Sequence, residues 1–161
     1  MHRVLHLDQT NATVANAIHS VQMAAYKQEA ELLGVRYFPP LERTPEDISR
    51  SDEHYLGVFE NERLVGALSL SQNRRSLGMN IDSLVVSPAR QRKGLGKALL
   101  AETLALYGTQ TLTVQTGAKN GPALALYSGF GFSESNRIVV GYEELELVVL
   151  CRPAATTRSA A

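Results

Sequence analysis

Residues 84–97 read Leu-Val-Val-Ser-Pro-Ala-Arg-Gln-Arg-Lys-Gly-Leu-Gly-Lys, and they lead from an apolar strand through a basic loop into a helix rich in alanine and leucine. The first N–H groups of a helix have no partner within it, and the helix dipole makes this end positive. Gly94 and Gly96 let a ligand approach the main chain and permit φ values closed to other residues. Positive charge comes from three side chains, those of Arg92, Lys93 and Lys97. The stretch therefore predicts a site for an anion such as a pyrophosphate.

Spacing separates three kinds of phosphate-binding loop. A Walker A loop has a glycine five residues before its Gly-Lys pair and a Ser or Thr after it, but these places hold Gln91 and Ala98. A dinucleotide-binding loop has Gly or Ala three residues after its second glycine, and this place is Leu99. The remaining pattern is Gln-x-x-Gly-x-Gly at residues 91–96, after a strand that ends in Val-x-Pro.

A second motif lies downstream, at residues 120–132, with the sequence Asn-Gly-Pro-Ala-Leu-Ala-Leu-Tyr-Ser-Gly-Phe-Gly-Phe. Asn120 and Tyr127 are seven residues apart within it. Taken together, the two motifs resemble those of the Gcn5-related N-acetyltransferases, the GNAT family, whose cofactor is acetyl-coenzyme A. The resemblance covers residues 55–135 in detail and the rest of the chain in outline.

The resemblance implies an α+β fold, with a mixed central sheet of about seven strands flanked by four helices. Residue patterns predict the same order of elements. The expected strands are 3–7, 55–59, 64–70, 79–86, 111–116, 132–140 and 144–151. The expected helices are 13–33, 45–50, 95–107 and 121–128. In the resembled fold the two central strands, here 79–86 and 111–116, splay apart to admit the pantetheine arm of the coenzyme.

One domain is expected over residues 1–152. A disordered C-terminal tail is expected at 153–161, because Pro153 ends the last strand and the residues after it are mostly Ala, Thr and Ser. Gly34 is expected to end the first helix, and Thr44 followed by Pro45 is expected to begin the second.

The resemblance also implies the residues that bind the coenzyme. They lie at the end of the central strand, in the basic loop and at the start of the last helix. The expected set is Leu84, Val85, Val86, Gln91, Arg92, Lys93, Gly94, Leu95, Gly96, Lys97, Asn120 and Ala123. The Val86 N–H is expected to polarise the thioester carbonyl. Tyr127 is expected to give a proton to the leaving thiolate, since a phenol with a pKa near ~10 suits a thiol with a pKa near ~8.5.

The group that takes the proton from the amine is left open. Some family members carry a glutamate twelve residues before the tyrosine, but this place is Gln115, which is no base. Asp82 is two residues from Leu84 and four from Val86, so strict alternation predicts that all three side chains face one side of the sheet. Asp82 is therefore the expected catalytic carboxylate, and a merely hydrogen-bonded or solvated role is the alternative. Glu29, Glu31 and bulk water are further candidates.

In the resembled fold the wall of the acceptor site comes from the first two helices and the segment that connects them, so the acceptor is expected to bind against this part of the chain. Tyr26, Glu29 and Phe38 are the expected substrate-binding residues, with Glu29 or Glu31 receiving a cation and Arg36 a carboxylate. For Phe38, lining the pocket and packing the core are equally expected.

Composition limits the function classes. The 161 residues include 16 basic and 16 acidic side chains, so the formal net charge is zero and no nucleic acid partner is expected. No apolar run approaches the ~20 residues that a membrane-spanning helix needs, so no membrane partner is expected. The single cysteine, Cys151, favours a reducing, cytoplasmic compartment. The four histidines lack a paired spacing, so no metal is expected.

The sequence therefore predicts an N-acetyltransferase that moves the acetyl group of acetyl-CoA directly to an amine of a small molecule or peptide, with a homodimer as its expected assembly. Two alternatives stay open, a non-catalytic sensor of CoA or acyl-CoA and transfer of a longer acyl group. The neutral charge argues against a DNA-associated regulator.

Overall fold

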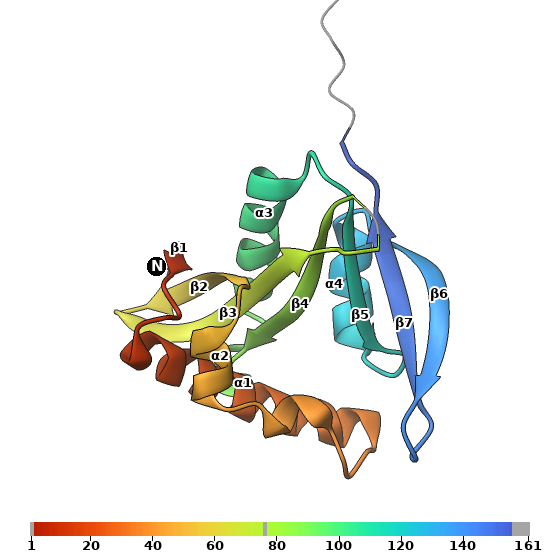
Figure 1. The fold of residues 1–161 in the computed structure, drawn as a ribbon, viewed down its shortest axis with the longest axis horizontal. Helices are drawn as coiled ribbons and strands as arrows, with labels where there is room; N and C mark the ends of the chain where they lie inside the picture. Colours follow the sequence, from red (N-terminus) through yellow and green to blue (C-terminus); the bar gives the residue numbers. More distant parts are fainter. Residues whose placement is uncertain (1, 76, 156–161) are drawn as a thin grey trace, which may run out of the picture.

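The computed structural model describes residues 2–75 and 77–155, and within them seven strands form one mixed sheet (Figure 1). Its strands lie in the order β1-β2-β3-β4-β5-β7-β6. Their bounds are β1 His2–Leu7, β2 His54–Glu60, β3 Arg63–Gln72, β4 Met79–Val86, β5 Leu112–Gly117, β6 Ser133–Val140 and β7 Leu145–Arg152. Neighbouring strands are antiparallel except β4 and β5, which are parallel.

Helices cover both faces of the sheet (Figure 1). They are α1 Ala12–Leu33, α2 Pro45–Arg50, α3 Leu95–Tyr107 and α4 Gly121–Gly129, with short 3-10 segments at Pro39–Glu42 and Pro88–Arg90. One core cluster joins α1 and α2 to the sheet through residues such as Ile18 and Ile48. A second cluster joins α3 and α4 to the opposite face through residues such as Leu99 and Tyr127. The expected α+β class, with seven strands and four helices, is confirmed.

The predicted helix boundaries follow from local chemistry. Gly34 ends α1 with φ 72°, a left-handed angle that glycine adopts freely. The Thr44 side chain accepts a hydrogen bond from the Asp47 N–H, and the Asp47 carboxylate accepts one from the Thr44 N–H, which together form a capping box before α2. Pro45 occupies the first position of this helix, as predicted. Both expected boundaries are confirmed.

The splay of the two central strands is visible in their register (Figure 1). β4 and β5 pair only over three residues, from Met79 opposite Leu112 to Ile81 opposite Val114. Beyond this point each strand keeps its outer neighbour, β3 or β7, but the two no longer pair with each other. The expected splay is confirmed.

A β-bulge in β4 explains why the pairing ends there. Ser69 of β3 lies opposite Ser83, but the next residue, Leu70, lies opposite Ile81, so Asp82 is an extra residue on β4. A bulge bends its strand and increases the local twist. The bend therefore turns the second half of β4 away from β5 directly after the last paired residue.

The C-terminal part of the chain tests the domain limits only partly. β7 ends at Arg152, and the Ala155 N–H donates to the Gly108 carbonyl at 3.0 Å. Residues 156–161 of the expected tail lie outside the described residues, so the boundary stays a prediction. Across the described part of the chain, every helix is too short or too polar to pass through a lipid bilayer.

Candidate active site

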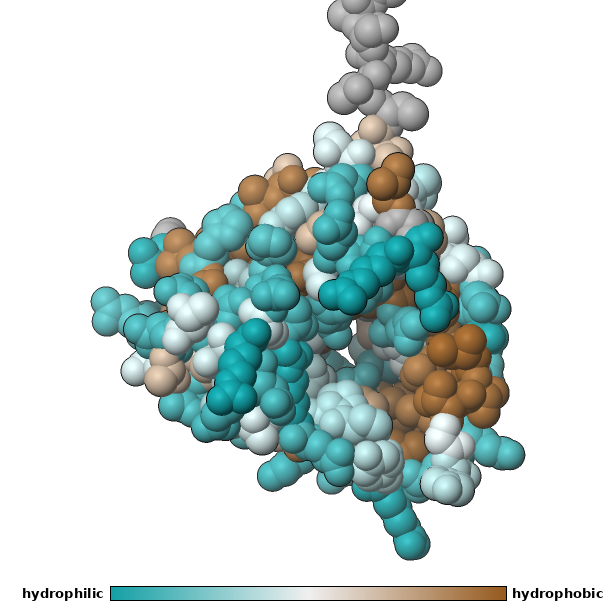
Figure 2. Space-filling view, viewed as in Figure 1, coloured by the Kyte–Doolittle hydropathy of each residue, from teal (hydrophilic) through white to brown (hydrophobic). Residues whose placement is uncertain are grey.

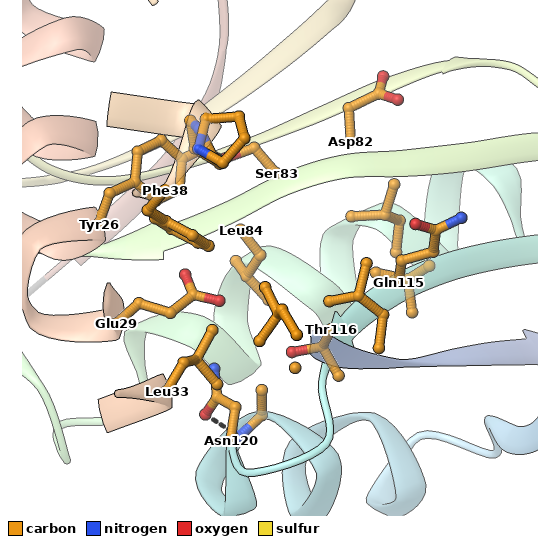
Figure 3. Close-up of a pocket in the computed structure, with 18 of the residues that line it drawn as sticks. Tyr26, Glu29, Leu33, Phe38, Asp82, Ser83, Leu84, Gln115, Thr116 and Asn120 are labelled. Atoms are coloured by element: carbon orange, nitrogen blue, oxygen red, sulfur yellow. Dashed lines mark hydrogen bonds between the residues drawn. The ribbon is translucent and has the colours of Figure 1, made fainter. Parts of the chain in front are cut away.

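A cavity of about 310 Å³ lies where β4 and β5 separate. Figure 2 shows the surface hollowed in this region, and Figure 3 shows the side chains around the hollow. Its walls come from α1, the segment that follows α1, the facing halves of β4 and β5, the start of α4 and the β6–β7 hairpin. The strand splay thus opens a space within the sheet, between β4 and β5, that is lined by α1 on one face of the sheet and by α4 on the other.

Residues from six separate parts of the sequence meet in this cavity. Eight of the expected site residues line it, namely Tyr26, Glu29, Phe38, Asp82, Leu84, Asn120, Ala123 and Tyr127. The structure thereby brings together the expected catalytic and substrate-binding residues and part of the expected cofactor site. The basic loop lies outside the cavity, beyond the end of β4.

The edge of β4 that faces the cavity carries open main-chain groups. The Ser87 N–H donates to Val65 of β3 at 2.8 Å, so alternate residues of β4 direct their main-chain groups towards β3, and Leu84 and Val86 direct theirs the other way. The Val86 carbonyl accepts a hydrogen bond at 3.3 Å from the side chain of Gln91 instead of from β5. The Val86 N–H therefore faces the gap and is free to donate to a ligand.

Val85 faces the opposite way. Its side chain is buried in the core cluster under α1, and its carbonyl oxygen lies on the β3 side, 3.1 Å from where a Cβ on Gly66 would be. Of the three strand residues expected to bind the coenzyme, Leu84 and Val86 thus present main-chain groups to the gap and Val85 does not.

The start of α3 has the features of an anion site. Its N-cap, Gly94, has φ 78° and offers no side chain to the first helical turn, so among the described residues these N–H groups have no capping side chain. Arg92 also has a positive φ, of 66°. Gly96 differs from the expectation, because it lies inside the helix with an ordinary φ, and a Cβ there would meet Leu126 at 3.4 Å. The prediction that Gly96 needs a special φ is therefore wrong.

Tyr127 lies on α4 with its ring against that of Phe132, the two centroids being 5.4 Å apart. It is only 4% exposed, yet it lines the cavity. Burial raises the pKa of its phenol well above the usual range, and the charge of Glu29 adds to this rise. The hydroxyl is therefore protonated at neutral pH, as a proton donor must be, but it is a weaker acid than the ordinary phenol assumed from the sequence.

Asn120 fixes the start of α4 and also touches α1. Its side-chain oxygen accepts a hydrogen bond at 3.2 Å from the Ala123 N–H, which caps the helix. Burial raises the pKa of the Glu29 carboxyl group, and a hydrogen bond from the Asn120 side chain partly opposes the rise. In Figure 3 the Glu29 carboxylate points into the cavity. Asn120 thus caps the helix that carries Tyr127 and lies beside the Glu29 carboxylate.

The prediction that Asp82 shares a face with Leu84 and Val86 is wrong. The bulge at Asp82 interrupts the alternation, so Leu84 and Ile81 pack against the same core cluster although they are three residues apart. The Asp82 side chain instead accepts a hydrogen bond at 2.9 Å from Asn80. Partial desolvation raises the pKa of Asp82, whose exposed carboxylate points away from the centre of the cavity in Figure 3.

Two aromatic residues form the wall towards α1. The Tyr26 hydroxyl lies 2.5 Å from the hydroxyl of Ser83, and burial raises the pKa of Tyr26 to about 12. Phe38 packs edge-on against Tyr26, with the ring centroids 6.0 Å apart. Phe38 is buried and also lines the cavity, so both expectations for it hold at once. Arg36, expected to hold a carboxylate, is exposed and lies outside the cavity.

Sequence reasoning missed the wall made by the β6–β7 hairpin, which contributes Val140, Leu145 and Leu147. It also missed Glu143 at the hairpin turn, whose carboxylate accepts hydrogen bonds from the N–H groups of Arg36 and Tyr37. These contacts join positions more than 100 residues apart, and no local pattern signals them. Within the described residues, no three His, Cys, Asp or Glu side chains are grouped as a metal site would require.

Comparison with known proteins bears directly on this arrangement. A model of the acetyltransferase (GNAT) family matches residues 16–132, which include β4, the basic loop, α3, β5 and α4. The chain belongs to the GNAT family. The resemblance of its two motifs to that family is therefore confirmed.

Individual relatives differ in how much they share with this chain. The UPF0157 protein YqkA of Bacillus subtilis is 35% identical over 133 residues, which are 82% of this chain and 38% of that protein. The chain thus spans well under half of this relative. The ribosomal-protein-S18-alanine N-acetyltransferase from Escherichia coli matches with a TM-score of 0.75 at 18% identity, over 100% of this chain and 99% of that one. The PaiA N-acetyltransferase from Thermoplasma acidophilum, in complex with coenzyme A, gives 0.75 at 15% identity over 95% and 99%. These two show a shared fold.

Proposed function

We propose that this protein transfers the acetyl group of acetyl-coenzyme A directly to the amine of a small molecule or peptide. The observation that carries the proposal is the opening of β4 from β5, which leaves the Val86 N–H unpaired beside a cavity that contains Tyr127 and Glu29. An acyl transferase needs a group that polarises the carbonyl, a proton donor and a carboxylate near the amine, and these residues supply all three.

The coenzyme fits the open edge and the start of α3. Its pyrophosphate suits the uncapped N–H groups at Gly94–Lys97, with Arg92 and Lys93 adding charge. The amides of its pantetheine arm suit the open main-chain groups of Leu84 and Val86, as an added strand would. The PaiA structure with coenzyme A, which shares the fold, supports this cofactor.

The proton transfers follow from the positions of the ionisable groups. The amine nitrogen forms a bond to the thioester carbonyl carbon while the Val86 N–H stabilises the developing oxyanion. The carbon–sulfur bond then breaks, and Tyr127 gives its proton to the leaving thiolate. Glu29 receives the proton lost by the amine, directly or through water, because its carboxylate points into the cavity. Asp82, at the rim, is the second candidate for this role.

The test is thiol release from acetyl-CoA with a panel of amines, amino acids and short peptides, using the natural protein and Tyr127→Phe. We expect Tyr127→Phe to bind the coenzyme normally and to lose turnover by about 10²–10⁴-fold, the usual contribution of general acid catalysis. Tyr107→Phe is the matched control, because Tyr107 lies at the end of α3 and outside the cavity. An unchanged kcat in Tyr127→Phe removes this residue from the role.

The same assay separates the alternatives. Coenzyme binding without thiol release to any acceptor would support the sensor function. Faster release from propionyl-CoA or succinyl-CoA than from acetyl-CoA would identify a longer acyl donor.

Composition and an exposed sheet edge support a cytoplasmic location and a homodimer. The lone cysteine, Cys151, favours a cytoplasmic location. β6 forms one edge of the sheet, and its residues are exposed or half-buried, which suits a homodimer formed along this edge. Light scattering on the purified protein tests the dimer.

A further inference from the structure

We infer that the acceptor is a small cationic amine that carries no carboxylate next to its amino group, and that polypeptide amines are excluded from the cavity. The inference rests on the proposed function and narrows its substrate. Two independent features carry it, the charges that line the cavity and the joining of two of its walls by Glu143.

The charges of the cavity are of one sign. Among the described residues that line it, the ionisable groups other than tyrosines are two carboxylates, those of Glu29 and Asp82. Glu29 is half-buried and points inward (Figure 3), so it attracts an ammonium group strongly and repels a second carboxylate. Most of the other lining residues are apolar, such as Leu33, Phe38 and Leu147. The site therefore matches a cationic head on an apolar body.

Among the described residues, no basic side chain lines the cavity. The Arg36 side chain is exposed outside the cavity. The charge of Arg43 acts on Tyr26 and Asp82, but its guanidinium is paired with Glu53 and does not line the cavity. An α-amino acid would therefore place its carboxylate beside Glu29 with no cation to receive it.

One side of the cavity is bounded by the segment after α1 and by the β6–β7 hairpin. These two are joined by a contact that we call the Glu143 latch, defined as the Glu143 carboxylate with the N–H groups of Arg36 and Tyr37. The three hydrogen bonds are 2.9, 3.0 and 3.0 Å long. They hold the pKa of the Glu143 carboxyl group below its usual range, so the latch is ionised at neutral pH.

The latch lies between residues that line opposite walls. Phe38 and Pro39 follow Tyr37 directly along the chain, whereas Val140 and Leu145 lie on either side of the Glu143 turn. A polypeptide acceptor would have to break the latch to pass its chain between these walls. A cavity of about 310 Å³, part of which must hold the acyl end of the coenzyme, admits a small amine without such a change.

The test compares amines with matched acids and peptides in the thiol-release assay. Each set contains an amine, its parent amino acid and a five-residue peptide amide that begins with that amino acid. Suitable sets start from phenethylamine and phenylalanine, isoamylamine and leucine, and cadaverine and lysine. We expect kcat/KM of the best amine to exceed that of its amino acid by at least about tenfold, because the carboxylate of the amino acid is repelled by Glu29 in the cavity. We expect it to exceed that of the peptide amide by a similar factor, because the peptide chain must break the Glu143 latch.

The outcomes separate the inference from the function on which it rests. An amino acid or peptide that reacts as well as its amine would overturn the inference and leave the transferase intact. Absence of thiol release with every acceptor, in protein that binds CoA in calorimetry, would overturn the proposed function and the inference with it.

Variants test the two features separately. Glu29→Gln is expected to slow the reaction of every acceptor, because Glu29 is the proposed proton acceptor, and to lower the amine-to-amino-acid ratio of kcat/KM severalfold, because the inward-pointing repelling charge is gone and only that of Asp82 is left. Glu31→Gln, an exposed neighbour on α1, is the matched control and is expected to keep the ratio. Glu143→Ala is expected to raise the peptide-to-amine ratio severalfold, and Glu143→Gln, which keeps an accepting oxygen, is expected to raise it less. A ratio unmoved by Glu29→Gln or by Glu143→Ala contradicts the corresponding feature.

Discussion

Replacing Glu53 by alanine is expected to destabilise the protein more than the removal of any single exposed charge. The Glu53 side chain is only 11% exposed. Its carboxylate accepts hydrogen bonds from both terminal nitrogens of Arg43, from the Tyr55 hydroxyl at 3.1 Å and from the Ser69 hydroxyl at 3.2 Å. Glu53→Ala therefore leaves three polar groups without their acceptor, at the point where the chain passes from α2 to β2.

The magnitude follows from these partners. Removing one member of a buried ion pair costs about 3–5 kcal/mol, and Arg43 keeps 27% of its side chain in contact with water, which favours the lower end. Each unpaired hydroxyl adds roughly 1 kcal/mol. We therefore expect Glu53→Ala to lower the free energy of unfolding by about 4–5 kcal/mol, equivalent to a fall in Tm of roughly 8–20 °C in a chain of this size.

Urea denaturation followed by circular dichroism measures this loss, with Glu134→Ala as the control. Glu134 is paired with Arg137, but both side chains are about half exposed, so its removal is expected to cost less than about 1 kcal/mol. Equal losses in the two variants would refute the argument from burial. Recovery in the double variant Arg43→Met, Glu53→Ala would confirm that an unpaired guanidinium causes much of the loss.

The same carboxylate predicts a dependence on pH. Burial pushes the pKa of Glu53 up, but hydrogen bonds and charge from Arg43 outweigh it, so the folded-state pKa lies below the ordinary value. At acidic pH the unfolded chain therefore binds the proton more readily. The stabilisation by Glu53 is complete above its unfolded pKa and is lost as the pH falls through the folded pKa, so the difference between natural protein and Glu53→Ala shrinks in acid.

Three further substitutions test the site and its frame. Tyr26→Phe leaves the buried Ser83 hydroxyl without its partner and is expected to lower the free energy of unfolding by about 1–3 kcal/mol in urea denaturation. Gly94→Ala forces alanine to φ 78° at a cost of about 1–2 kcal/mol and is expected to weaken CoA binding in calorimetry; unchanged affinity would contradict the anion site at α3. Gly117→Ala places a Cβ 2.3 Å from Leu33 and is expected to cost about 1–3 kcal/mol, measured as a fall in Tm.

Much of the frame was predictable from short-range patterns. The bounds of β4 and α3, residues 79–86 and 95–107, agree with the structure at both ends because an apolar strand and an Ala/Leu helix are each decided by their own residues. The start of α2 was predictable for the same reason, since Thr44 and Pro45 act within one helical turn. The 3-10 segment at Pro39–Glu42 was not predicted, because proline fixes φ but not ψ, and ψ decides between an extended segment and a 3-10 turn.

The candidate site was predictable in its residues and less so in their directions. Tyr127 and Asn120 belong to one motif in which they are seven residues apart, so this motif predicts their positions, and both line the cavity. Glu29 had no such signal, because its place in the cavity depends on how α1 lies across the open sheet. The Glu143 latch depends on a contact between the β6–β7 turn and the segment after α1, which only the folded chain brings together.

The bulge at Asp82 connects these separate observations. A regular β4 would continue its pairing with β5, since β5 has the residues to extend the register as far as Gly117. One extra residue ends the pairing, and it also reverses which residues direct their main-chain groups into the gap, so that Val86 faces it instead of Val85. The same reversal moves the Asp82 carboxylate off the face of Leu84. A carboxylate in the centre of the cavity must then come from another element, and Glu29 of α1 supplies it.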